Sequence, residues 1–327
     1  MTLAHPGQAE IFLTGIDAAV LDAQRLANEQ LATMPHPDVR TPDGLAQLRT
    51  LTSPPPRQTS LTPQDLVVAI DGAQRRIRSF VPPAPARAVM LRFHGGGWAA
   101  GAPEDDDSLN DEIARGCNVA VVSPEYTLTP AVTVREQILE CVALTEWVAV
   151  NAERLWGTRR LLIGGISAGA HLAAATLVRL RERHAAAMEQ IVGAHLDCGS
   201  YDLSGTPSAR AADERTLVLT RTWLEGLREI GLPGLSPEEC RSPDVSPLFA
   251  TLTGLPPAFL VVGALDPSLD DALFLAARWR AAGNKASIEV WPEAAHAFTN
   301  MGTPLAGYAL EHTKSWIADI LSNDLSR

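Results

Sequence analysis

Residues 165–169, with the sequence GISAG, constrain the fold more than any other stretch of the chain. The stretch reads G-x-S-x-G, follows the apolar run 161–163 and opens a helix-like run over 170–183. A serine on so sharp a turn is strained, and a glycine on either side removes the Cβ that would collide with neighbouring backbone. Strand, turn and helix in this order predict a nucleophile elbow, with the Ser167 hydroxyl above a sheet and beside a helix N-terminus.

The rest of the chain supplies a sheet for this elbow. An antiparallel hairpin is predicted over 66–81, with its turn at Asp71 and Gly72. Predicted strands then alternate with helices; the strands cover 88–93, 119–122, 161–163, 191–196, 258–262 and 287–291, and the helices cover 108–115, 134–150, 170–183, 269–282 and 308–321. Alternation with apolar strands predicts an α/β fold whose mostly parallel central sheet is flanked by helices. Ligands bind such sheets at the carboxyl ends of the strands.

Two segments fall outside this alternation and predict a helical cap. Residues 1–55 form an N-terminal helical segment that ends in a proline-rich linker, and 56–327 form the catalytic domain, with an insertion at about 203–245. Both segments carry apolar residues at helical spacing: Ile11, Phe12, Ile16 and Val20 in the first, and Leu217, Leu224 and Leu227 in a helix over 216–229. Such faces are expected to close the acyl pocket above Ser167, and a surface helix pair remote from the site is the alternative.

A second glycine-rich motif follows the strand 88–93. Residues 94–98 read HGGGW, and three consecutive glycines allow a tight loop that presents backbone N–H groups without obstructing side chains. Paired with the elbow, this loop is interpreted as an oxyanion loop. His94 is expected to brace it.

A serine hydroxyl needs a base, and the base needs an orienting carboxylate. Asp266 follows the strand 258–262 and His296 follows the strand 287–291, so both lie on the same rim as Ser167. The competing acids Asp270 and Asp271 fall at the start of a helix, where a capping role is expected.

The remaining histidines suggest no metal site, because they do not cluster. His5, His36, His184 and His312 are expected in solvent, His195 in the core or at the rim, and His171 beneath the elbow.

Together these motifs resemble the hormone-sensitive-lipase-like branch of the α/β-hydrolases, which includes bacterial carboxylesterases. The oxyanion loop matches 94–98, the elbow 165–169, the D-P-x-x-D segment 266–270 and the H-x-F segment 296–298. The resemblance implies an α/β-hydrolase fold with a catalytic triad of Ser167, Asp266 and His296. It also implies an oxyanion hole of Gly96, Gly97 and Ala168, and no cofactor or metal. The candidate substrate-binding residues are Trp98, Tyr126, Ile166, Trp223 and Phe298.

Two departures from the family pattern concern the surroundings of the site. Ile166 stands where the family has an acidic residue, and Thr127 and Ala131 stand where it has arginine and glutamate. A scaffold salt bridge is therefore expected to be missing.

The expected function is a serine carboxylesterase for small to medium, apolar esters, acting through an acyl-enzyme. An amide or formamide hydrolase of the kynurenine formamidase type is one alternative, and a non-catalytic ligand-binding homologue is another. A net charge of −11 argues against a nucleic-acid partner, and the apolar runs are too short for stable membrane insertion. Four scattered cysteines and an N-terminus without a secretory pattern suggest a cytoplasmic protein. The family often forms homodimers.

Overall fold

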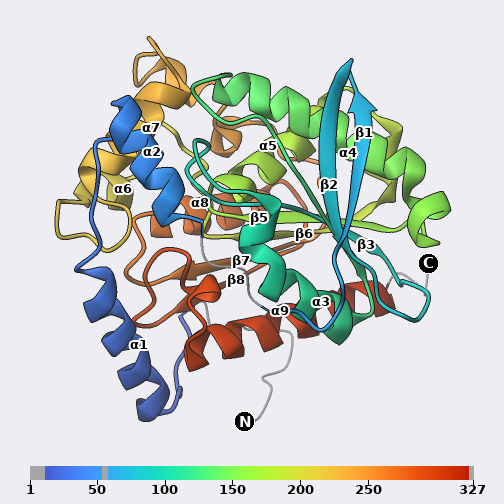
Figure 1. The fold of residues 1–327 in the computed structure, drawn as a ribbon, viewed down its shortest axis with the longest axis horizontal. Helices are drawn as coiled ribbons and strands as arrows, with labels where there is room; N and C mark the ends of the chain where they lie inside the picture. The colour runs from blue at the N-terminus through green and yellow to red at the C-terminus, as the bar shows by residue number, and fades with distance from the viewer. Residues whose placement is uncertain (1–11, 54–57, 324–327) are drawn as a thin grey trace.

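The computed structural model describes residues 12–53 and 58–323, and the strands of these residues form one eight-stranded sheet (Figure 1). The strand order is β1-β2-β4-β3-β5-β6-β7-β8. The β1–β2 and β2–β4 pairs are antiparallel, and every other pair is parallel. The predicted mostly parallel sheet with an antiparallel hairpin at its edge is confirmed.

The bounds of the elements follow the predicted alternation closely. The strands are β1 (Gln64–Ile70), β2 (Ala73–Phe80), β3 (Val89–Phe93), β4 (Ala120–Pro124), β5 (Leu161–Ile166), β6 (Ile191–Asp197), β7 (Ala258–Gly263) and β8 (Ala286–Trp291). The helices that cover the sheet are α3 (Asp107–Cys117), α4 (Val134–Trp156), α5 (Ala168–Glu182), α8 (Leu269–Ala281) and α9 (Pro304–Asn323). The other helices are α1 (Ala18–Leu31), α2 (Pro42–Leu51), α6 (Pro207–Ala211) and α7 (Arg221–Gly231).

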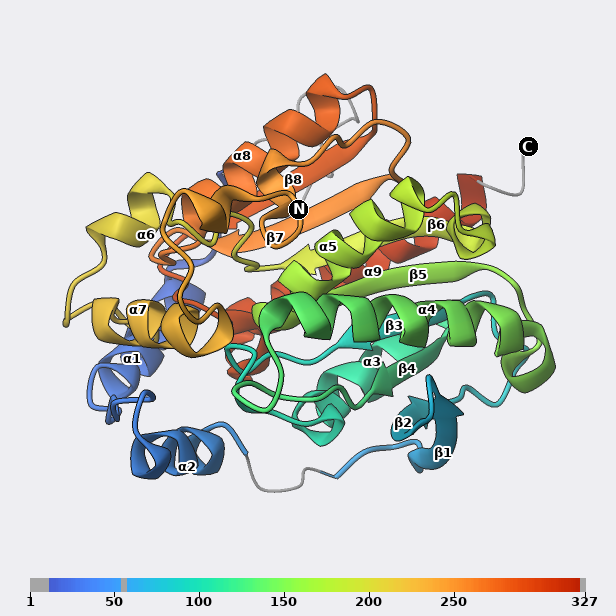
Figure 2. The ribbon, with the colours of Figure 1, turned by 90° about the horizontal axis from the view of Figure 1, so that it is seen from above.

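Alternate residues of the central strands pack into different layers. In β3, Leu91 and Phe93 join the cluster formed with α4, α5 and α8, whereas Met90 joins the cluster formed with α3 and α9. In β7, Leu260 joins the cluster formed with α4, α5 and α8, whereas Phe259 joins a cluster on the other face that includes residues of α9. Two-residue periodicity of the strand thus places apolar side chains on both faces, and helices cover both (Figure 2). Along residues 12–53 and 58–323, no helix is long and apolar enough to cross a membrane.

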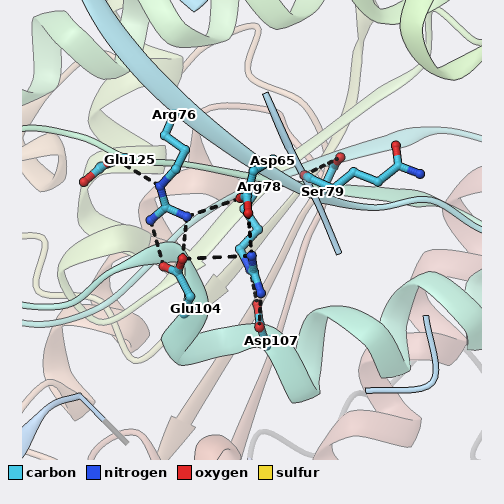
Figure 3. Close-up of polar contacts among 8 residues, drawn as sticks. Asp65, Arg76, Arg78, Ser79, Glu104, Asp107 and Glu125 are labelled. Atoms are coloured by element: carbon cyan, nitrogen blue, oxygen red, sulfur yellow. Dashed lines mark hydrogen bonds and ion pairs between the residues drawn. The ribbon is translucent and has the colours of Figure 1, made fainter. Parts of the chain in front are cut away.

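A network of ion pairs joins the hairpin to the segment after the glycine loop (Figure 3). Arg78 of β2 forms a bidentate pair with Asp107, at 2.7 and 2.8 Å. Arg76 binds Glu104, and both arginines reach Asp65 of β1. Bidentate guanidinium–carboxylate pairs fix geometry as well as distance. The network therefore anchors residues 104–107, where the chain leaves the glycine loop and enters α3.

The predicted helix over 216–229 begins later, at Arg221. Thr220 is its N-cap and accepts a hydrogen bond from the N–H of Trp223, while Val218 has a positive φ of 65°. A residue in that conformation cannot continue a right-handed helix. Residues 216–219 therefore form an irregular loop.

The two segments outside the alternation meet at one end of the molecule (Figures 1 and 2). The Trp223 indole of α7 donates a hydrogen bond to the carbonyl of Pro37 at 2.8 Å, and Arg40 pairs with Glu229 at 2.6 Å. The stretch from α1 to α2 therefore packs on the insertion between β6 and β7.

The beginning of the N-terminal segment packs elsewhere. Phe12 forms a parallel bridge with Val290 of β8, and Ile16 and Val20 pack against the cluster that contains Phe259 and Trp291. The prediction that Phe12, Ile16 and Val20 close the pocket is therefore wrong, because they lie against the apolar surface beside β7 and β8 instead. Ile11 lies outside the described residues.

Candidate active site

The turn between β5 and α5 has the geometry of an elbow. Ser167 has φ 55° and ψ −121°, and its N–H donates to the Asp197 carbonyl of β6 at 2.8 Å. A Cβ on Gly165 would lie 2.5 Å from the Phe93 carbonyl oxygen, and a Cβ on Gly169 would overlap the same oxygen. Both glycines are therefore required by close approach to β3, and the strained serine is held by its neighbours.

Three side chains from different strand ends form a hydrogen-bonded chain at this turn. His296 Nε2 lies 2.7 Å from Ser167 Oγ, and His296 Nδ1 lies 2.9 Å from Asp266 Oδ2. The imidazole and the carboxylate are almost completely buried. Since Asp266 can only accept at this position, Nδ1 carries the proton and Nε2 is free to accept from the serine.

Ser268 positions the carboxylate of Asp266, a role that sequence reasoning missed. Its backbone N–H and its hydroxyl both donate to Asp266 Oδ1, each at 2.7 Å. The only signal in the sequence was its place inside the D-P-x-x-D segment.

The two competing acids are turned away from the histidine. Asp270 accepts from the N–H of Ser208, and Asp271 accepts from Thr206 and from two backbone N–H groups that follow β6. Burial raises the pKa of Asp271 to about 7. Neither carboxylate caps α8, whose N-cap Ser268 has no side-chain capping bond. The predicted capping role is wrong, because both acids tie the insertion to α8 instead.

The glycine loop leaves backbone donors beside the serine. Gly96 and Gly97 have φ of 113° and 60°, and the Gly96 carbonyl accepts from Ala99 and Ala100 in a tight turn. The N–H groups of Gly96, Gly97 and Ala168 donate to no atom of the residues that the structure describes. Gly97 and Ser167 line the same cavities. Three free donors near a serine hydroxyl can bind an oxyanion.

Buried side chains hold this loop in place. The Tyr126 hydroxyl donates to the His94 carbonyl at 2.9 Å, and the two rings stack with centroids 4.2 Å apart. The Trp98 indole donates to His171 Nδ1 at 3.1 Å, and His171 Nε2 donates to the Val245 carbonyl at 2.7 Å. Burial lowers the pKa of His171 to about 4, so its ring stays neutral and can both accept and donate. His171 therefore links the glycine loop, the elbow helix and the insertion.

The stretch that departs from the family pattern has other supports. Gln137 donates to the carbonyls of Trp98 and Thr127, and Arg49 of α2 donates to the carbonyls of Ala99 and Thr129. These hydrogen bonds join the glycine loop to residues 127–129 without the family's salt bridge. They bring α2 of the N-terminal segment into the same framework.

Two cavities open from Ser167. The first, of about 370 Å³, is lined by Gly97, Trp98 and Ala168 and by the insertion, including Leu224 and Leu227 of α7. The second, of about 560 Å³, is lined by Ile166, His296 and the N-terminal segment, including Leu31 and Met34. Of the candidate substrate-binding residues, Trp98 and Ile166 line these cavities.

Tyr126, Trp223 and Phe298 do not belong to the described lining of either cavity. Tyr126 braces His94, Trp223 is directed at Pro37, and Phe298 packs on Trp291. All three are buried between elements, so in this structure they support the site rather than line it, and their contact with substrate stays a prediction. Aromatic character alone does not distinguish a buried brace from a pocket wall.

Several histidines take positions other than those predicted. His195 lies in the core and His184 in solvent, as predicted. His36 packs edge-on against Trp223, and His312 pairs with Glu289 at 2.9 Å, so both are half-buried. His5 lies outside the described residues.

One group of side chains has the composition of a metal site. Cys198, Asp266 and His296 each offer one ligand atom, and these atoms lie within 4.8 Å of one another. Burial raises the pKa of Cys198 well above its usual value, which disfavours the thiolate that a metal requires. The Asp266–His296 hydrogen bond already occupies the other two side chains. This group therefore fits the hydrogen-bonded chain better than a metal.

The fold and the places of these side chains at strand ends define an α/β hydrolase. The chain belongs to the alpha/beta hydrolase fold family, whose sequence profile matches residues 90–300. It is similar to the carboxylesterase NlhH of Mycobacterium tuberculosis, with 29% identity over 78% of this chain and 81% of the relative. It is also similar to an acetyl-hydrolase of Streptomyces hygroscopicus, with 31% identity over 65% of this chain and 70% of the relative.

Solved structures show the same architecture. The thermostable carboxylesterase EstE1, cloned from a metagenomic library, superposes with a TM-score of 0.74 at 25% identity, over 94% of this chain and 99% of that one. These relatives confirm the resemblance that the sequence motifs predicted.

Proposed function

We propose that this protein is a serine carboxylester hydrolase in which Ser167 is the nucleophile, His296 the base and Asp266 the residue that orients the base. The observation that carries the proposal is the continuous hydrogen-bonded chain from Asp266 through His296 to Ser167 Oγ. Relatives named carboxylesterase and acetyl-hydrolase support an ester as the substrate class.

The geometry supports the following sequence of steps. Ser167 Oγ attacks the ester carbonyl carbon while its proton passes to His296 Nε2, and the carbonyl oxygen becomes an oxyanion. The N–H groups of Gly96, Gly97 and Ala168 donate to that oxyanion, each worth about 3 kcal/mol of transition-state stabilisation. His296 returns the proton to the departing alcohol, which leaves an acyl-serine. Water, deprotonated by the same imidazole, then releases the acid and restores the serine.

The position of His296 gives the ester a direction in the site. The imidazole must protonate the leaving oxygen, so the alcohol part lies beside it. His296 lines the second cavity and is absent from the described lining of the first. We therefore assign the alcohol part to the second cavity and the acyl part to the first. Cavities of about 370 and 560 Å³ suit small to medium esters.

A fluorophosphonate probe and an ester assay test the proposal. The native protein is expected to be labelled at Ser167 and to hydrolyse 4-nitrophenyl acetate with a burst of one nitrophenol per chain. Once labelled, the protein is expected to show neither the burst nor the steady hydrolysis. Absence of labelling would instead favour a ligand-binding homologue. Faster hydrolysis of N-formylkynurenine than of any ester tested would replace the ester with a formamide as the preferred substrate.

The N-terminal segment is proposed to act as part of a cap over the second cavity. Met34 lines this cavity, so Met34→Ala removes apolar contacts with the alcohol part. The expected result is a KM for 1-naphthyl acetate raised by about fourfold or more, since one buried methylene is worth about 0.8 kcal/mol. The KM for methyl acetate, which has a far smaller alcohol, is expected to stay within twofold. Steady-state kinetics measure both.

Leu26→Ala is the matched control for the cap, because Leu26 lies on α1 but is 59% exposed. It is expected to change neither KM. Unchanged kinetics in Met34→Ala for both esters would show that the segment is a surface helix pair without influence on substrate.

A further inference from the structure

Three arginines line the first cavity, together with the Ser167 turn. Arg210 comes from α6, and Arg221 and Arg228 come from α7. Of the cavity-lining residues of α7, Arg221, Leu224 and Arg228 are spaced by three and four positions and share one face of the helix, and Glu225 and Leu227 line the cavity beside them. Two neighbouring helices of the insertion therefore present guanidinium groups to a cavity that also has apolar walls.

The guanidinium groups of these arginines are not paired with carboxylates of the described chain. None of the three lies within 4 Å of a carboxylate oxygen among the described residues, and Arg221 Nε donates to the carbonyl of Ala212 at 2.9 Å. Most arginines near the hairpin, by contrast, are paired. An unpaired guanidinium keeps several N–H donors available for an anion.

The carboxylates of the same cavity already have partners. Asp202 Oδ1 accepts from the N–H and the hydroxyl of Ser204, and Asp271 accepts from Thr206 and from two backbone N–H groups that follow β6. Glu225 also lines the cavity, has a half-exposed side chain and lies 3.9 Å from Arg40. Burial raises the pKa of Asp271 to about 7, so it carries only part of a negative charge near neutral pH. The cavity therefore combines three arginines that have no carboxylate partner within 4 Å with Asp202, Glu225 and the partly protonated Asp271.

The second cavity is lined by carboxylates. Asp105, Asp106 and Glu112 line it, and no lysine or arginine of the described chain does. Glu112 is paired with Arg115 at 2.6 Å and with Lys314 at 3.3 Å, so Asp105 and Asp106 are the carboxylates of this cavity without an ion-pair partner among the described residues. Burial raises the pKa of Asp105 to about 6, and the neighbouring carboxylates add to this rise. We therefore expect a second anionic group to be less favourable on this side of Ser167 than beside the arginines of the first cavity.

We propose that this site prefers esters whose acyl chain ends in a carboxylate, that is, half-esters of dicarboxylic acids. The inference rests on the proposed ester hydrolysis and on the assignment of the acyl part to the first cavity. The acyl carbon is attacked by Ser167, the chain extends along Leu224 and Leu227, and its terminal carboxylate meets the arginines of α6 and α7. Guanidinium groups bind carboxylates through paired N–H donors, which gives direction as well as affinity.

A matched pair of esters tests the preference. Mono-4-nitrophenyl adipate and 4-nitrophenyl hexanoate have the same leaving group and acyl chains of the same length, and differ by a carboxylate in place of a methyl. The kcat/KM for the adipate, after subtraction of spontaneous hydrolysis, is expected to exceed that for the hexanoate by about tenfold or more. Arg228→Leu and Arg210→Leu are each expected to lower the adipate-to-hexanoate ratio by about tenfold. Added salt is expected to lower the ratio as well, since the groups are partly exposed.

Arg215→Leu is the control, because Arg215 lies in the same insertion, pairs with Asp213 and has a side chain that is 93% exposed. It should leave the ratio unchanged. A native ratio at or below one, or a ratio unaffected by both cavity variants, would overturn the inference while hexanoate hydrolysis upholds the proposed function. A preference for esters that carry the carboxylate on the alcohol would overturn it too. If neither ester is hydrolysed, the proposed function itself fails.

Discussion

Replacement of Ser167 by alanine is expected to lower kcat for 4-nitrophenyl acetate by about a millionfold. The hydroxyl is the atom that forms the acyl bond, and loss of the nucleophile alone removes nearly all that a triad contributes. The remaining rate is expected to exceed that of the uncatalysed reaction in water by about a thousandfold, because the free N–H groups of Gly96, Gly97 and Ala168 still bind an oxyanion. Fluorophosphonate labelling should disappear.

Ser200→Ala is the matched control, since Ser200 lines the first cavity together with Ser167. Its rate is expected to stay within a few-fold of the native rate, and thermal melting should show both variants folded. Retention of activity and labelling in Ser167→Ala would refute the assignment of the nucleophile.

Replacement of Asp266 by asparagine is expected to lower kcat by about ten-thousandfold, as when the orienting carboxylate of such a triad is replaced. The asparagine amide can donate to Nδ1, which favours the imidazole tautomer with its proton on Nε2. That tautomer cannot accept the proton of Ser167, although His296 Nε2 and Ser167 Oγ are expected to stay at their native separation of 2.7 Å. Steady-state kinetics and a crystal structure of the variant would check rate and geometry together.

Asp270→Asn makes the same chemical change four residues along the chain. Asp270 accepts a hydrogen bond from the N–H of Ser208 and does not contact His296, so its variant is expected to keep the rate within a few-fold. Loss of activity in Asp270→Asn together with native activity in Asp266→Asn would reverse the two roles.

The sheet and the candidate triad could be read from the sequence because their signals are local. The glycines at 165 and 169 are required by the approach of the turn to Phe93, and an apolar strand before each of Ser167, Asp266 and His296 predicts a common rim. The burial pattern of parallel strands makes that prediction robust, since β3, β5 and β7 are buried along their whole length.

Contacts between distant segments could not be predicted in the same way. Trp223 was expected in the pocket and instead meets Pro37, and Ile16 was expected over the site and instead packs under β7 and β8. An amphipathic helix shows that one face is buried but not against which surface. The positioning roles of Ser268 and His171 depend on hydrogen bonds to Asp266 and to the Val245 carbonyl, which only the tertiary structure shows.

The sequence by itself determined the order of strands and helices, the strained turn at Ser167 and the rim on which Asp266 and His296 stand, because sterics and periodicity act between near neighbours in the chain. Only the tertiary structure decided which side chains surround the serine. The arginines of α6 and α7 lie on one side and the carboxylates of residues 105, 106 and 112 on the other. The potential at a point sums charges from segments far apart in the sequence, and no local pattern contains that sum.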